Sequence, residues 1–357
     1  MKSWDVIVLG CGVIGASIVR ELNKSGMRVL VVEGGEPGRE ASHAAAGMLA
    51  PLGGDLPPEL SELAVASAAM YPEFVRELDD EAAARPREPH VLPIDLRNQG
   101  TILIGDERFE GAIPLNRCEI AKLEPHLAAT IARSMFIEES SVDPRGLMAA
   151  LVRSLKHRGV DLVHGTRATN IVRARDGSFE VHTDKSKYST GAVVNCCGAW
   201  AGEIAGSSRL PTKARKGQMF SVIPRKSPLL QHVIRSEEVY LVPRSDGRIL
   251  IGATVEDCGF DKKVHPDSIL HMQHLAEQLV PEIAKAKIHE TWAGLRPGTP
   301  DDLPILGESN MPGYFIATGH FRNGILLAPI TAGIMARLLR GEATDYPLEA
   351  FSPSRFS

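Results

Sequence analysis

The sequence predicts a mixed α/β fold, in which a Rossmann-like domain built on a parallel sheet is interleaved with a second, mostly antiparallel α+β domain. An apolar run at residues 5–9 is followed at once by a glycine-rich turn at 10–15, a helical stretch and a second apolar run at 28–33. This order of strand, turn, helix and strand is typical of a dinucleotide-binding unit. The same alternation of predicted strand and helix occurs twice more, later in the chain. Stretches that predict strands and turns separate the three occurrences.

The glycine-rich turn reads Gly10-Cys-Gly-Val-Ile-Gly15. Gly10 permits the tight turn, Gly12 lets backbone amides approach a pyrophosphate, and Gly15 lets the helix pack closely on the strand. The pyrophosphate then lies at the positive end of the helix. Glu33 ends the second strand, where it can accept hydrogen bonds from an adenosine ribose. An acid at this position disfavours a 2′-phosphate, so NADP is not expected, but NAD and FAD both remain open.

The bulk composition is that of a globular protein long enough for two domains. The 357 residues are 43% hydrophobic and 24% charged, with a formal net charge of −4, which favours neither nucleic acid nor an anionic membrane as a partner. The five cysteines form no metal-binding spacing, so no metal site is expected and a reducing compartment is favoured. The first strand begins by Asp5, which leaves no room for a signal peptide, and the uncharged stretch 323–336 is too short to span a bilayer. We expect a cytoplasmic protein.

Between the second strand and residue 143 the sequence pattern indicates, in turn, a loop, a helix and short strands. Residues 34–54 are rich in glycine and alanine and predict a backbone-dominated loop, suited to lie close to a flat ligand. Residues 57–84 have helical spacing, and Pro72 predicts a break in that helix. From 97 to 140 the apolar runs are short and predict strands.

The nucleotide-domain pattern resumes at Asp143, a predicted N-cap followed by proline at the first helical position. Short apolar runs up to residue 198 predict further strands. Strand and turn patterns then fill 213–260, and a strand, a glycine turn and an apolar helix follow after 312. We therefore predict a discontinuous cofactor domain of residues 1–75, 143–208 and 290–357, and a substrate domain of residues 76–142 and 209–289.

Three sequence patches carry a family resemblance. They are Ala41-Ser-His-Ala-Ala-Ala-Gly-Met-Leu-Ala-Pro51, Trp292-Ala-Gly-Leu-Arg-Pro-Gly-Thr-Pro-Asp301 and Gly319-His-Phe-Arg-Asn-Gly-Ile-Leu-Leu-Ala-Pro329. Together with the opening turn and Tyr240-Leu-Val-Pro-Arg244, they resemble the glycine oxidase (ThiO-type) branch of the D-amino-acid oxidase superfamily of FAD-dependent amine oxidoreductases. The resemblance runs over the whole chain.

The resemblance implies a glutathione-reductase-like cofactor domain that binds FAD non-covalently. It also implies oxidative deamination of glycine, or of a small N-substituted glycine or D-amino acid, with hydride transfer to the flavin and dioxygen as the final acceptor, giving hydrogen peroxide. In that family the imine from glycine feeds synthesis of the thiamin thiazole ring, and the proteins tend toward homo-tetramers.

The chemistry needs an anchor for the substrate carboxylate, and Arg296 is the best candidate because a guanidinium matches a carboxylate bidentately. The alternative is a structural ion pair. Arg322 lies in a glycine turn from which it can reach flavin and substrate, or merely support the loop. Tyr240 is implied to line the substrate pocket, as are Met48 and Val255. Val255 stands where a relative that favours glycine is expected to have methionine, so the pocket can be larger.

The resemblance and the opening turn together give the predicted cofactor contacts. His320 is expected to contact the flavin through its backbone, and the helix that follows to direct its N-terminal amides at the flavin. A covalent link through His43 stays open, although the spacing does not match that of known histidyl flavoproteins. The full predicted set is Gly10, Gly12, Val13, Ile14, Gly15, Glu33, Gly34, Ala41, Ser42, Ala46, Gly47, Met48, Ala168, Gly198, Gly319, His320, Phe321, Arg322, Asn323, Gly324, Ile325 and Leu326.

Two other functions remain as alternatives. One keeps the fold but makes the chain a D-amino-acid or sarcosine-type dehydrogenase with another electron acceptor. The other is a flavin-binding protein without turnover, which the presence of both Arg296 and Tyr240 argues against, because such a protein has no use for a carboxylate anchor.

Overall fold

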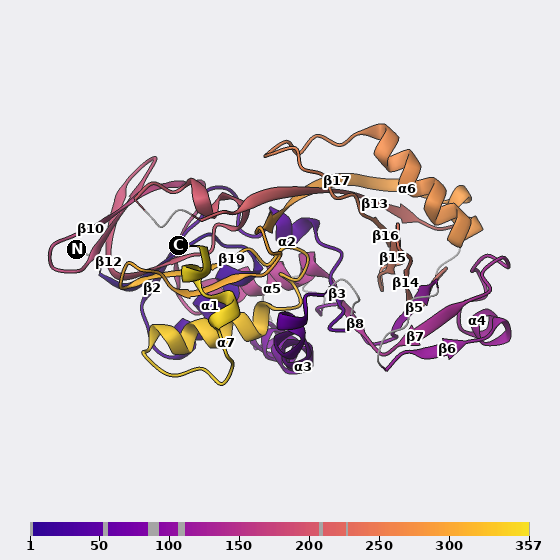
Figure 1. The fold of residues 1–357 in the computed structure, drawn as a ribbon, viewed down its shortest axis with the longest axis horizontal. Coiled ribbons are helices and arrows are strands. Elements are labelled where there is room, and N and C mark those ends of the chain that lie inside the picture. The colour runs from indigo at the N-terminus through magenta and orange to yellow at the C-terminus, as the bar shows by residue number, and fades with distance from the viewer. Residues whose placement is uncertain are drawn as a thin grey trace.

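The computed structural model shows an elongated molecule with two lobes, joined by long strands that run between them (Figure 1). Both chain termini lie at the lobe that carries the N-terminal strand. The structure describes residues 3–52, 56–84, 93–105, 111–206, 210–225 and 228–356. Residues 53–54 of the predicted loop, and residues 106–110 and 226–227 of the predicted strand regions, lie outside this set.

The first lobe is built on a sheet whose centre is parallel, as the opening motif predicts. The strand β1 (Trp4–Leu9) lies between β2 (Val29–Val32) and β12 (Lys187–Asn195), and both pairings are parallel. The sheet order is β10 (Ala168–Arg173), β11 (Phe179–Thr183), β12, β1, β2 and β9 (Asp161–Val163), with β19 (Tyr314–Thr318) beside β12 and β18 (Ile305–Glu308) beside β19.

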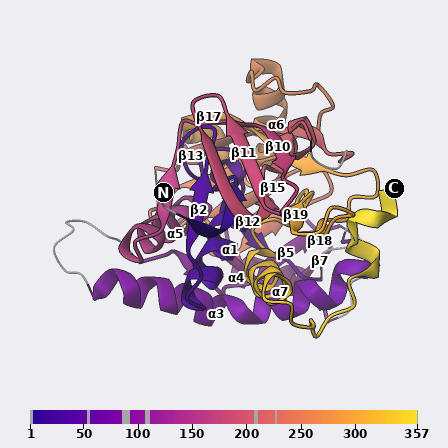
Figure 2. The ribbon, with the colours of Figure 1, turned by 90° about the vertical axis from the view of Figure 1, so that its left-hand side faces the viewer.

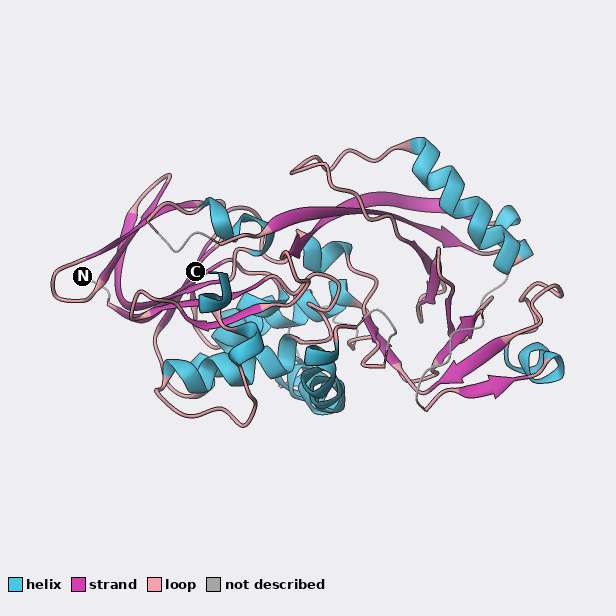
Figure 3. Cartoon of the chain, in the orientation of Figure 1, coloured by secondary structure: helices cyan, strands magenta, loops and turns pink. Residues whose placement is uncertain are grey.

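Helices cover one face of this sheet (Figure 3). Alternate residues of β1 explain why the sheet is buried on both sides: Val6 and Val8 pack against the helices, and Ile7 and Leu9 pack into a separate apolar cluster on the opposite face. The covering helices are α1 (Val13–Lys24), α3 (Ser61–Ala83), α5 (Pro144–His157) and α7 (Ala328–Leu339). Asp143 caps α5 through a 3.1 Å bond from the amide of Arg145, which confirms the predicted N-cap.

The predicted break at Pro72 does not occur. The helix α3 is continuous (Figure 2), and Pro72 lies inside it. Proline removes one backbone hydrogen bond, which tertiary contacts on the neighbouring turn can offset. The hydroxyl of Ser67 donates to the carbonyl of Leu326 at 2.6 Å, and the buried Tyr71 hydroxyl donates to the carbonyl of Ile325. Both contacts hold α3 against the segment that precedes α7.

The second lobe is built on a mostly antiparallel sheet. Its two longest strands, β13 (Lys213–Ile223) and β17 (Lys287–Gly298), pair along their whole length. Only the pairing of β14 with β5 is parallel among the described strands of this sheet. The order is β17, β13, β16 (Ile249–Gly252), β15 (Tyr240–Pro243), β14 (Val233–Arg235), β5 (Thr101–Ile104), β7 (Ser134–Ile137) and β6 (Ile113–Leu115).

The two faces of the second sheet have different neighbours. The helix α6 (Pro266–Leu279) covers the outer face, where Phe220 and Ile251 pack with Met272 in one apolar cluster. On the inner face Met219 packs in another cluster, with Ala46 from the first lobe. Inner-face side chains therefore point toward the first lobe.

Short elements complete the fold. The segment predicted as a plain loop contains a short helix, α2 (Ala41–Ala44), and a two-residue strand, β3 (Met48–Leu49), which pairs in a third small sheet with β8 (Ser140–Val142) and, through β8, with β4 (Leu96–Arg97). The remaining elements are α4 (Arg117–Leu123) and 3₁₀ turns at Pro58–Leu60, Gly198–Glu203, Pro281–Lys285, Glu349–Phe351 and Pro353–Phe356.

The predicted boundary at residues 75 and 76 falls inside α3, and the one at 289 and 290 falls inside β17. The division into a cofactor and a substrate domain therefore stays a proposal. No described helix combines the length and the apolar character needed to cross a membrane.

Candidate active site

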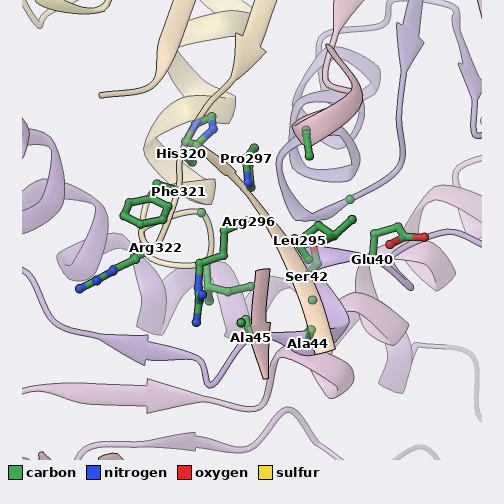
Figure 4. A pocket seen from close by; sticks show the side chains of 18 of the residues that line it. Glu40, Ser42, Ala44, Ala45, Leu295, Arg296, Pro297, His320, Phe321 and Arg322 are labelled. Atoms are coloured by element: carbon green, nitrogen blue, oxygen red, sulfur yellow. The ribbon is translucent and has the colours of Figure 1, made fainter. Parts of the chain in front are cut away.

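A cavity of about 1520 Å³ runs from the carboxyl ends of β1 and β2 to the inner face of the second sheet. Figure 4 shows the part where β17, the 320–322 turn and α2 meet, with Arg296 and Arg322 beside each other. Its walls come from segments far apart in the sequence. Predicted site residues that line it are Gly10, Gly12, Val13, Ile14, Glu33, Gly34, Ala41, Ser42, Ala46, Gly47, Met48, Ala168, Gly198, Tyr240, Val255, Arg296, His320, Phe321, Arg322, Asn323, Gly324, Ile325 and Leu326.

Two predicted residues, Gly15 and Gly319, are not among the lining residues but shape the backbone beside it. A Cβ at Gly15 would lie 2.1 Å from the carbonyl oxygen of Gly10, so the helix can approach the strand this closely only with glycine there. Gly319 has a positive φ of 77°, and a Cβ there would lie 2.6 Å from Cγ2 of Thr299. His43 is also absent from the lining, and its ring nitrogen contacts Arg39 at 2.8 Å instead.

One end of the cavity is organised around the Glu33 carboxylate. Its two oxygens accept hydrogen bonds from the backbone amides of Cys11 and Gly35, each at 2.7 Å. These bonds fix the carboxylate at the end of β2. Gly34 and Ala168 line the cavity next to it, so this end has the shape and the acceptor that an adenosine requires.

The start of α1 is the anion-binding part of the cavity. No side chain of the N-cap residue Gly12 blocks the first turn, and a Cβ there would meet only the Ser42 hydroxyl, at 3.2 Å. Ser42 accepts a 2.9 Å hydrogen bond from the amide of Val13 and so brings the 41–42 segment against the helix start. The backbone amides at a helix start and the helix dipole favour a pyrophosphate here.

The 46–48 turn forms the wall between this part and the second sheet. Gly47 has a φ of 77°, and a Cβ there would lie 2.0 Å from the carbonyl oxygen of Val142, so only glycine fits. The buried Arg244 donates a hydrogen bond to the carbonyl of Ala46. Burial lowers the pKa of Arg244 to about 10, so its guanidinium is still charged at neutral pH. Arg244 belongs to a motif that the sequence analysis quoted, but its role in holding this turn was missed.

The 319–326 turn forms the opposite wall. The amide of Phe321 donates to the carbonyl of Pro297 at 2.9 Å, which ties the turn to the strand that carries Arg296. The helix α7 begins only at Ala328, beyond the last lining residue, so turn residues rather than the first helical turn line the cavity. The expectation that the first amides of this helix are directed at the flavin stays a prediction.

Burial keeps His320 neutral. Its Nε2 lies 3.1 Å from the Thr331 hydroxyl, and removal from water lowers its pKa to about 3. A buried histidine that stays neutral in this way is not suited to act as an acid–base group.

The lowered pKa of His320 predicts acid sensitivity. Unfolded histidine has a pKa of about 6.5, so as the pH falls below that value the unfolded chain binds a proton that the folded chain does not. Folding stability should therefore fall between about pH 6.5 and about pH 3, by at most about 1.4 kcal/mol per pH unit from this residue. His320→Gln should lessen this slope in unfolding measured between pH 7 and pH 5. Equal slopes for parent and variant would show that His320 is not held neutral.

Arg296 stands on β17 and points into the cavity beside Tyr240. Its Nη1 donates a 3.0 Å hydrogen bond to the carbonyl of Thr254. Among the residues that the structure describes, no carboxylate forms an ion pair with Arg296. Removal from water is the main cause that lowers the pKa of Arg296, and the neighbouring charge of Arg322 adds to it. A guanidinium so placed favours an anionic ligand, and a structural ion pair is not seen.

Tyr240 and Gly217 complete the surroundings of Arg296. The Tyr240 hydroxyl lies 3.6 Å from the sulfur of Met219, and burial raises the pKa of the phenol, which therefore stays protonated. A Cβ at Gly217 would lie 2.3 Å from Nη1 of Arg296, so the guanidinium rests on bare backbone. A glycine inside a strand often marks the close approach of another group, so Gly217 in the middle of β13 is the one local signal for this contact.

These features fit FAD. The cavity offers a ribose acceptor, amides at a helix start and, between the 46–48 and 319–326 turns, main chain that only glycine allows at Gly47. The site thus has the elongated shape and the backbone-lined walls that a dinucleotide with a flat ring needs.

Comparisons with known proteins agree with this assignment. The profile of the family described as "DAO: FAD dependent oxidoreductase" matches residues 5–338. The bifunctional protein ThiO/ThiG of Trichormus variabilis is 34% identical over 99% of the chain, which spans 55% of that relative's length. Subunit HcnC of the hydrogen cyanide synthase of Pseudomonas aeruginosa is 31% identical, with 99% of the chain and 97% of HcnC covered.

The crystal structure of glycine oxidase from Geobacillus kaustophilus superposes with a TM-score of 0.91 at 33% identity, covering 99% of this chain and 98% of that one. Fold, site and sequence thus lead to the same family. The chain belongs to the DAO family of FAD-dependent oxidoreductases, and FAD is its cofactor.

Proposed function

We propose that this chain oxidises the amine of glycine, or of a small N-substituted glycine or D-amino acid, and passes the electrons to dioxygen. The observation that carries the proposal is Arg296, a guanidinium at the cavity wall that has no carboxylate partner among the described residues and stands beside Tyr240. Full-length similarity to a glycine oxidase supports the same substrate class.

In this proposal the chain's own residues bind and orient the substrate. Arg296 holds the carboxylate bidentately, and the protonated Tyr240 hydroxyl donates a further hydrogen bond to it. The 46–48 turn and the 319–326 turn enclose the amine end and keep water away from it. FAD, when bound, supplies the acceptor for a hydride from the substrate carbon. The imine that leaves the site hydrolyses in water to a 2-oxo acid and ammonia, or to a 2-oxo acid and the corresponding amine when the substrate nitrogen carries a substituent.

Several finer points belong to the same proposal. FAD is bound without a covalent link, because His43 does not line the cavity. Val255 lies at the cavity wall and is 45% exposed, so substituents on the amine or carbon can extend past it. Supply of an imine for thiamin thiazole synthesis, a homo-tetramer and a cytoplasmic location stay predictions.

One assay separates the candidate functions. Purified yellow protein is mixed in air with glycine, sarcosine, N-ethylglycine and D-alanine, and peroxide is measured with the visible flavin absorbance. Peroxide supports the oxidase. Loss of flavin absorbance without peroxide supports a dehydrogenase with another acceptor, and no change with any amine supports a flavoprotein without turnover.

Gly217→Ala should raise KM for the amino acid without removing Arg296. The added methyl group would lie 2.3–2.5 Å from three guanidinium atoms, so the side chain must move away from its place beside Tyr240. Overpacking of this kind costs about 1–3 kcal/mol, and we expect KM to rise about tenfold. Steady-state kinetics of the holoenzyme measure it.

Gly191→Ala is the matched control, because it adds the same methyl group to a strand where the nearest atom lies at 3.6 Å. Gly191→Ala should keep the parental KM. If Gly217→Ala kept it too, Arg296 would not bind the carboxylate from the observed position.

A further inference from the structure

A buried lysine lies directly behind Arg296. Lys216 is fully buried on the outer face of β13, and Gly217, the next residue, supports the guanidinium on the inner face. The Lys216 ammonium lies 3.5 Å from Oε2 of Glu256 and 4.0 Å from Oδ2 of Asp261, and it makes no hydrogen bond to the described residues. A buried cation is destabilising unless it is compensated, so a role beyond packing must be sought for it.

The Lys216 cation compensates Glu256, and Glu256 in turn holds Thr254. One carboxylate oxygen of Glu256, Oε1, accepts hydrogen bonds from the Thr254 hydroxyl at 2.5 Å and from Nε2 of Gln218 at 2.7 Å. The Thr254 hydroxyl also accepts from the backbone amide of Gln218 at 2.9 Å. Backbone bonds of 2.9 Å in both directions join Lys216 to Glu256. The Thr254 peptide is thus fixed from the outer face of the sheet.

The Thr254 peptide is also the partner of Arg296. Its carbonyl accepts the 3.0 Å bond from Nη1 of Arg296 on the inner face. A continuous series of contacts therefore leads from the Lys216–Glu256 ion pair, through Thr254, to the guanidinium in the cavity.

We propose that Lys216 and Glu256 are positioning residues for the substrate-carboxylate anchor. Their ion pair holds the Thr254 carbonyl in the orientation that directs the Arg296 guanidinium toward the cavity. This inference rests on the proposed function, in which Arg296 binds the carboxylate. Neither residue is among those that line the cavity, so both act through Thr254 and not on substrate or cofactor.

The test measures carboxylate binding to the yellow holoenzyme. Acetate carries a carboxylate but no oxidisable amine, and its binding is followed by the change in the flavin spectrum. Lys216→Met and Glu256→Gln keep the side-chain size, and each should raise the acetate Kd about three- to tenfold, as expected for one poorly held hydrogen bond. Their KM for glycine should rise by a similar factor with kcat and the FAD Kd little changed.

The double variant should raise the acetate Kd no more than the stronger single variant does, because both act through one peptide. Lys263→Met is the matched control, because Lys263 is an exposed lysine in the loop that also contains Glu256, and it forms no ion pair with the described residues. It should leave the acetate Kd unchanged. If Lys216→Met is too unstable to purify, Glu256→Gln, whose side chain is partly exposed, decides the question.

Two failures are distinguishable. If Arg296→Ala binds acetate as the parent does, the proposed function is wrong at its anchor. If Arg296→Ala weakens acetate binding but Lys216→Met and Glu256→Gln do not, only the positioning inference is overturned. It is also overturned if these two variants lower the thermal midpoint while the acetate Kd and KM stay at the parental values, because the ion pair is then purely structural.

Discussion

Arg296→Ala should raise KM for glycine by about 100-fold or more while the protein stays yellow. The variant loses a bidentate pair of charge-assisted hydrogen bonds, each of which contributes about 1.5–3 kcal/mol. FAD binding should persist, because the ribose acceptor Glu33 and the start of α1 lie at the other end of the cavity. Steady-state kinetics and a flavin spectrum of the purified variant measure both effects.

Arg215→Ala is the control for this substitution. Arg215 pairs with Arg296 across β13 and β17, but its guanidinium lies 3.9 Å from Asp257 and it is not among the cavity-lining residues. We expect a parental KM for Arg215→Ala. An Arg296→Ala enzyme with parental KM would show that the carboxylate is bound elsewhere.

Gly12→Val should abolish FAD binding without unfolding the protein. Gly12 has extended backbone angles, which valine adopts readily, and a Cβ there would meet only the Ser42 hydroxyl at 3.2 Å. The new side chain occupies the place where the pyrophosphate approaches the amides of α1. Colourless protein with a circular dichroism spectrum like that of the parent is the expected result.

The matched control is Gly333→Val in α7, where no atom outside the local helix lies within 4 Å of a built Cβ. That variant should purify yellow. Yellow Gly12→Val protein with parental FAD affinity would place the cofactor away from the start of α1.

The local patterns of the sequence predicted the parts of the fold that depend on neighbours in the chain. The strand–turn–helix unit at 4–24, the capped helix at Asp143 and the buried strands are set by apolar periodicity and by glycine and proline positions, which are visible in one sequence. The predicted break at Pro72 was wrong, because contacts of Ser67 and Tyr71 with a segment more than 250 residues away stabilise the helix.

Most residues named from the sequence line one cavity, but the contacts that hold them in place were not predicted. Motif residues such as Arg296 and the 319–326 turn could be identified because the patches resemble a known family. Arg244 on the Ala46 carbonyl and Thr254 on Arg296 could not, since each contact joins two strands or turns whose register only the folded chain defines. Lys216 follows Arg215 at the polar start of a strand, so nothing in the local pattern distinguishes it from an exposed lysine.

The central claim is that Arg296 uses the carboxylate of an amino acid to place its amine at the flavin. The most direct test mixes the holoenzyme anaerobically with glycine and, separately, with methylamine, which has the amine but no carboxylate. We predict rapid loss of visible flavin absorbance with glycine and, at equal concentration, a rate at least about 100-fold lower with methylamine. Equal rates with the two amines, or no loss of absorbance with glycine, sarcosine or D-alanine, would contradict the account.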